Sequence, residues 1–162
     1  MVGMIVYIVY ISRLLLPPNR SMTQSSMYVW GTANPSGEAN ENYAGLYLRH
    51  RDIDTFISEL PGKPVKVEHA GDPVGRVVHA WRNQSAGLDC ILQIDNKASL
   101  DGAVIASLIH SNCARELSLG YKVRMDMSEA AHTGKAHLEK EIVEVSIVKR
   151  GMRPNCLIHA HS

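Results

Sequence analysis

Three stretches of the sequence carry residue types that together could cleave an amide bond. The first, residues 115–123, alternates as a strand does, with Leu117 and Leu119 on one face and Ser118 on the other. Gly120 beside the serine leaves room for a substrate or another backbone to approach closely. The pattern places the serine on the face of the strand with little bulk, although an ordinary polar strand position has the same pattern.

A histidine that could act as a base lies upstream of this serine. His69 ends an alternating segment, residues 64–69, and a Gly-Asp-Pro turn is expected to follow at residues 70–73. An imidazole presented at a strand end can accept a proton near neutral pH. Because the chain has eight histidines, a purely structural role is the alternative.

A carboxylate that could orient the histidine is expected downstream, in the β-branched strand at residues 137–148. Glu141 and Glu144 are the candidates, and their odd separation predicts that they face opposite sides of the sheet. Only one could then point at Ser118, where it would fix the tautomer of the imidazole and stabilise the imidazolium. The alternative for either residue is a charge that discourages association between sheet edges.

A basic turn, Lys149-Arg150-Gly151, ends that strand. Such a turn could direct backbone N–H groups and a cation at a developing oxyanion. A solvated basic turn is the alternative interpretation.

The rest of the chain predicts a small α+β domain. Strands are expected at residues 27–31, 43–48, 64–69, 74–81, 88–94, around Ser118 and at 137–148. Helices are expected at 52–60, capped by Asp52 or Asp54, and at 99–112, capped by Ser99. Residues 32–42 read as a loop and 154–162 as a short tail. We therefore expect a small, mostly antiparallel, closed β-barrel of about seven strands with helices packed outside.

Composition sets further limits. The 162 residues are 45% hydrophobic and 20% charged with a net charge of +1, which gives no electrostatic case for nucleic acid. Three cysteines without a CxxC pair indicate neither a disulfide framework nor a zinc site, and no cofactor is expected. A cysteine nucleophile at Cys113 is possible on position alone, but this residue is better explained as the small apolar end of a helix.

We expect residues 1–26 to be a tail outside the true start, or else a weak membrane anchor, and residues 27–162 to form the domain.

Taken together, the motifs resemble the capsid maturation proteases of herpesviruses (assemblins) and the prohead proteases of tailed phages. The resemblance covers residues 27–158 and is closer to the phage branch. It lies in Pro73-Val74-Gly75-Arg76-Val77 after the histidine, in Ser118-Leu119-Gly120-Tyr121, in Glu144-Val145-Ser146-Ile147-Val148 and in Arg153-Pro154-Asn155.

The resemblance implies a serine endopeptidase that cleaves scaffold and capsid-associated proteins, itself included, inside an assembling viral capsid within the host cell. Ser118 would be the nucleophile and His69 the base. Where herpesvirus enzymes have a second histidine this chain has Glu141, which makes Glu141 the implied third member, with Glu144 and His137 as rivals. Lys149 and Arg150 fall where those enzymes have a paired arginine turn beside the oxyanion. A homodimer is possible. No membrane contact is expected unless the N-terminal apolar segment is a membrane anchor. The alternative function is an inactive capsid-assembly or scaffold-binding domain of the same fold.

Overall fold

The computed structural model describes residues 26–36, 48–95, 100–126 and 137–162. It has two helices, α2 (His50–Glu59) and α3 (Leu100–His110). Seven strands form one sheet: β1 (Met27–Ser36), β2 (Pro64–Val67), β3 (Ala70–Arg82), β4 (Ala86–Ile94), β5 (Glu116–Asp126), β6 (His137–Val148) and β7 (Ile158–His161). The expected α+β class and the mostly antiparallel sheet are confirmed.

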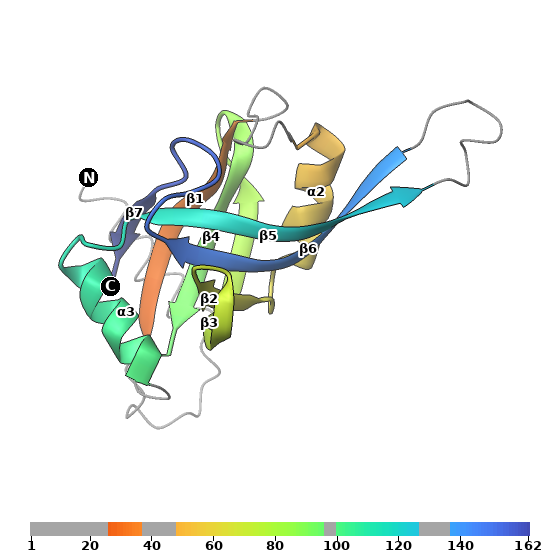
Figure 1. The fold of residues 1–162 in the computed structure, drawn as a ribbon. Coiled ribbons are helices and arrows are strands. Elements are labelled where there is room, and N and C mark those ends of the chain that lie inside the picture. The colour runs from red at the N-terminus through yellow and green to blue at the C-terminus, as the bar shows by residue number, and fades with distance from the viewer. Residues whose placement is uncertain (1–25, 37–47, 96–99, 127–136) are drawn as a thin grey trace, which may run out of the picture.

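The sheet is open, which corrects the prediction of a closed barrel. Its order is β5-β6-β2-β3-β4-β1-β7, so β5 and β7 are its two edges. All neighbours are antiparallel except β2 and β6, which run parallel. Within the described residues, an isolated bridge between Glu116 and Leu157 joins the two edges, and two backbone hydrogen bonds support it, from Leu117 N to Cys156 O and from Ile158 N to Arg115 O. The sheet therefore curves almost upon itself without a continuous ladder across the gap (Figure 1).

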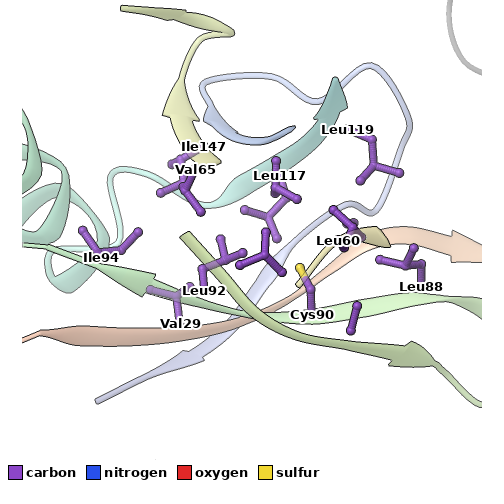
Figure 2. Packing of buried hydrophobic residues seen from close by; sticks show 14 of the residues in the cluster. Val29, Leu60, Val65, Leu88, Cys90, Leu92, Ile94, Leu117, Leu119 and Ile147 are labelled. Carbon is purple, nitrogen blue, oxygen red and sulfur yellow. The ribbon is translucent and has the colours of Figure 1, made fainter. Parts of the chain in front are cut away.

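One contiguous core lies inside the curve. Alternate residues of the strands point into it, because side chains of successive strand residues face opposite ways. Figure 2 shows ten of them gathered from five strands and the end of α2: Val29, Leu60, Val65, Leu88, Cys90, Leu92, Ile94, Leu117, Leu119 and Ile147. The predicted inward face of the serine strand is thus confirmed, and Ser118 lies on the other face.

Helix α2 covers the part of the core beneath β6. Its N-cap is Arg49, whose backbone N–H donates to the carboxylate of Asp52 at 2.9 Å. Asp52 therefore caps the helix from its third position, one turn later than an N-cap residue. The same carboxylate accepts from Lys140 Nζ of β6 at 2.7 Å, and both side chains are buried. This ion pair attaches the helix to the outer half of the β5–β6 pair, which reaches beyond α2 in Figure 1.

Several predicted boundaries change. Strand β1 continues to Ser36, because residues 32–36 pair with β4 where a loop was expected. The turn after β2 lies at Glu68 and His69, and residues 70–73 belong to β3. Strand β7 replaces part of the expected tail because it pairs with β1. The predicted strand at 43–48, the cap Ser99 and the tail 1–26 fall outside the described residues, apart from Leu48 and Ser26. Neither described helix is long and apolar enough to cross a membrane.

Candidate active site

Strand β6 brings the serine and histidine segments together, because it lies between β5 and β2. Ser118 on β5 is paired with Ser146 on β6, and Ser146 is paired with Lys66 on β2. The turn that follows β2 therefore comes to lie over the outer face of the β5–β6 ladder. His69 stands in that turn.

The three side chains form a linear hydrogen-bonded chain. His69 Nε2 lies 2.9 Å from Ser118 Oγ, and His69 Nδ1 lies 2.6 Å from Glu144 Oε1. An ionised carboxylate can only accept, so Nδ1 carries the proton and Nε2 accepts from the serine hydroxyl. This is the arrangement in which an imidazole can take a proton from a hydroxyl while a carboxylate stabilises the resulting cation. Ser118 and Glu144 are buried, whereas the His69 side chain is 37% exposed and faces solvent.

Ser146 adds a fourth polar group that the sequence analysis had not assigned. Its hydroxyl donates to Glu144 Oε1 at 2.8 Å and accepts from the backbone N–H of His69 at 3.1 Å. It is fully buried. One hydroxyl therefore holds both the carboxylate and the backbone of the histidine. The signal for it was present, since a residue two positions after Glu144 must share its face of the strand.

The turn that carries His69 is strained. Val67 pairs with Ala70, so Glu68 and His69 are the two central residues of a tight hairpin, and their φ angles are 50° and 59°. Glycine or asparagine is preferred in such turns, and each residue held in this region costs on the order of 1 kcal/mol or more. Backbone strain of this size is retained only where the surroundings fix it, and here it aims the imidazole at Ser118.

The carboxylate on the histidine is Glu144, and the expected contact with Glu141 is not made. Glu141 instead pairs with Arg124 at 2.7 Å, farther out along the ladder. The prediction of opposite faces for the two glutamates was also wrong. Gly120 pairs with Glu144 and Tyr121 with Ile142, so a bulge at Val143 puts both glutamates on the Ser118 face. Nothing in the sequence marked the bulge. The side chain of His137 lies outside the described residues.

Gly120 makes space for this carboxylate. A Cβ built on Gly120 would lie 2.5 Å from Glu144 Cγ and 2.8 Å from Glu144 Oε1. Gly120 was expected to leave room for a substrate or another backbone, but the neighbour that fills this space is the side chain of Glu144.

The basic turn lies next to the site, but two of its backbone donors are already occupied. Lys149 N–H donates to Glu68 Oε1 at 2.6 Å, and Gly151 N–H donates to Glu116 Oε2 at 2.6 Å. Lys149 and Arg150 themselves are exposed. The turn therefore carries two exposed cationic residues, and the N–H groups of Lys149 and Gly151 are held by carboxylates.

None of the three cysteines belongs to the hydrogen-bonded group of Ser118, His69, Glu144 and Ser146. Burial raises the pKa of the Cys90 thiol far above its ordinary range, and burial likewise raises the pKa of Cys156 to about 12. Thiols held in the protonated form are poor nucleophiles. Cys113 is exposed, and its Sγ contacts Ser111 O at 3.8 Å. No set of three or more potential metal ligands gathers anywhere in the described part of the chain.

No protein-family model and no curated protein match this sequence. Solved structures do match. The protease of Kaposi's sarcoma-associated herpesvirus in complex with a hexapeptide phosphonate inhibitor superposes with a TM-score of 0.56 at 17% identity, covering 85% of this chain and 65% of that one. The same viral protease in complex with a dimer disruptor gives 0.49 at 19% identity, covering 85% and 77%. This chain thus spans about two thirds of the length of the first of these proteins. At such identity the likeness concerns the fold, and the chain has the fold of a herpesvirus protease.

Proposed function

We propose that this protein is a serine endopeptidase with Ser118 as nucleophile, His69 as base and Glu144 as the orienting acid. The observation that carries the proposal is the position of the imidazole, 2.9 Å from Ser118 Oγ on one side and 2.6 Å from Glu144 Oε1 on the other. Both distances are those of hydrogen bonds that proton transfer requires.

The chemistry follows from these contacts. His69 Nε2 takes the proton of Ser118 as Oγ forms a bond to the scissile carbonyl carbon. The imidazolium, stabilised by Glu144, then gives that proton to the leaving amine as the C–N bond breaks. Water, deprotonated by the same imidazole, hydrolyses the acyl-serine and restores the hydroxyl. A β-strand holds the nucleophile here, without the strand-to-helix elbow of G-x-S-x-G enzymes.

The oxyanion would form beside the turn at residues 149–151. Lys149 and Arg150 supply positive charge there, and charge that is fixed in place before the reaction stabilises the tetrahedral intermediate. The N–H groups of Lys149 and Gly151 are occupied by glutamate side chains. The contribution of the turn in this proposal is therefore its cationic side chains.

The substrates that we propose are scaffold and capsid-associated proteins of an assembling virus particle, with self-cleavage included and a homodimer as the possible active form. The motif resemblance to capsid maturation proteases and the shared fold support this assignment. Phage-type prohead cleavage belongs to the same proposal. The site of action would then be the interior of the immature capsid inside the host cell.

An inactive capsid-assembly domain of this fold is the alternative. That function places no constraint on the distance between Ser118 and His69 and predicts no hydrogen bond between them. The observed contact, together with a buried carboxylate on the far nitrogen, favours the peptidase.

The decisive experiment combines covalent labelling with substitution. A fluorophosphonate probe is expected to form one adduct on Ser118, located by peptide mass spectrometry, and iodoacetamide pretreatment should leave labelling unchanged. Ser118→Ala should abolish both labelling and cleavage of a co-expressed scaffold protein. Retention of the parent's cleavage rate by Ser118→Ala would refute the proposal. Labelling that iodoacetamide blocks would point to Cys113 chemistry instead.

A further inference from the structure

The turn at residues 149–151 is held at both ends by carboxylates that are close in sequence to the two proposed reacting residues. Glu68, immediately before His69, accepts from Lys149 N–H at 2.6 Å. Glu116, two residues before Ser118, accepts from Gly151 N–H at 2.6 Å. One short turn is thereby bonded to the histidine hairpin on one side and to the nucleophile strand on the other.

The approach of the turn to the nucleophile strand is close. A Cβ built on Gly151 would lie 2.9 Å from Leu117 O and 3.4 Å from Glu116 Oε2. Only a glycine lets the turn pack against the residue that precedes Ser118. The contact therefore rests on backbone shape as well as on the Glu116 hydrogen bond.

On the histidine side, the contact accompanies a strained residue. Glu68 has a φ of 50°, where a glycine would be relaxed. Its backbone N–H donates to Ile147 O at 3.1 Å while its side chain reaches Lys149 N–H. A glycine here would relieve the backbone but would remove the carboxylate that fixes the turn.

We infer that Glu68 and Glu116 are positioning residues that hold the basic turn in register with His69 and Ser118. This inference rests on the proposed peptidase function. Neither carboxylate contacts the hydroxyl or the imidazole, so each acts through the turn. Hydrogen bonds from N–H groups to carboxylates are shorter and stronger than neutral ones, which suits them to fixing a loop. A turn fixed before the reaction keeps the cations of Lys149 and Arg150 where the oxyanion develops, at no cost of reorganisation during the step.

The test measures how fast, and how tightly, a peptidyl diphenyl phosphonate reacts with Ser118. Glu116→Ala and Glu68→Ala should each lower the maximal rate of phosphonylation by about tenfold or more, because the cations of the turn are no longer fixed beside the developing negative charge. The half-saturating probe concentration should stay within about twofold, since neither substitution changes how the unreacted probe binds. Glu116→Gln and Glu68→Gln keep an acceptor oxygen and should recover most of the rate.

Glu59→Ala is the matched control, because Glu59 is exposed at the end of α2. It should react as the parent does. The double variant Glu68→Ala/Glu116→Ala should lose less than the product of the two single losses, because both residues hold one turn.

The outcomes separate the two proposals. If neither the parent nor Glu59→Ala forms an adduct on Ser118, the peptidase function fails. If both react while Glu68→Ala and Glu116→Ala keep the parent's maximal rate, the positioning role is overturned. Multiplicative losses in the double variant would also overturn it, since they would mean two independent effects. Glu68 is exposed, so its variants give an answer even if Glu116→Ala does not fold.

Discussion

Two clusters on this sheet combine a hydroxyl, an imidazole and a carboxylate, and they differ in which group stands in the middle. In the first, His69 lies between Ser118 and Glu144. In the second, at the far end of the sheet, Thr32 Oγ1 lies between Asp89 Oδ1 at 2.8 Å and His159 Nε2 at 2.6 Å.

The order of the groups decides what each cluster can do. When the imidazole is central, it can take the hydroxyl proton while the carboxylate compensates the new charge. When the hydroxyl is central and donates to the carboxylate, it accepts from the imidazole, so the imidazole is a donor and cannot remove the hydroxyl proton. Asp89 also accepts from Asn83 and from Trp30, so three donors converge on its carboxylate. The second cluster therefore joins β7 and β1 to β4 and is structural.

The largest expected effect distinguishes the two glutamates of β6. Glu144→Gln should lower the rate of peptide cleavage by about 10³- to 10⁴-fold, the size found when the buried acid of a serine triad becomes an amide. The physical reason is that a glutamine can donate to Nδ1 and favour the wrong tautomer. Glu141→Gln, at an exposed ion pair with Arg124, should stay within about twofold of the parent. Steady-state kinetics on one peptide substrate checks both, and equal losses would contradict the assignment.

The next effect tests the space that Gly120 provides. Gly120→Ala places a methyl group 2.5 Å from Glu144 Cγ, so the carboxylate must move away from His69. A displacement of about 1 Å in such a group costs roughly 10²-fold in rate. Val123→Ala on the same strand removes an exposed side chain and is the control. A parent-like rate for Gly120→Ala would show that Glu144 need not hold its observed position.

A smaller effect is expected at Ser146, which holds Glu144 and the backbone of His69 in place without taking part in the reaction. Ser146→Ala removes one donor to Glu144 and one acceptor for the backbone of His69. We expect about a tenfold loss in rate, corresponding to about 1.4 kcal/mol, a usual size for such a hydrogen bond. Ser58→Ala, whose hydroxyl bonds only within α2, should leave the rate unchanged. Equal rates for both alanine variants would exclude a supporting role.

The smallest effect on rate is expected in the second cluster. Thr32→Val should leave peptide cleavage unchanged and lower the free energy of unfolding by about 1–2 kcal/mol, because Asp89 and His159 lose a buried partner. Urea denaturation measures the change. Thr55→Val, at an exposed position of α2, should shift stability by no more than about 0.5 kcal/mol. A large loss of activity in Thr32→Val would remove the distinction between the clusters.

The sequence by itself determined the face of the strand on which Ser118, the proposed nucleophile, lies. Alternation around Ser118 placed Leu117 and Leu119 inside and the serine outside, since strand geometry is local. It also determined the position of the histidine segment and the class of fold. These properties depend on residues close together in the chain.

The tertiary structure decided which acid stands behind the histidine. Side chains of β6 would alternate strictly between the two faces only if its pairing with β5 were regular. The bulge at Val143, which arises from that pairing, breaks the alternation between Glu141 and Glu144. The turn that aims His69, the occupied donors of Lys149 and Gly151, and the open edge between β5 and β7 likewise depend on partners distant in sequence. A carboxylate's role follows from what lies opposite it, and in this sheet only the pairing of β5 with β6 placed Glu144 opposite a glycine and beside the imidazole.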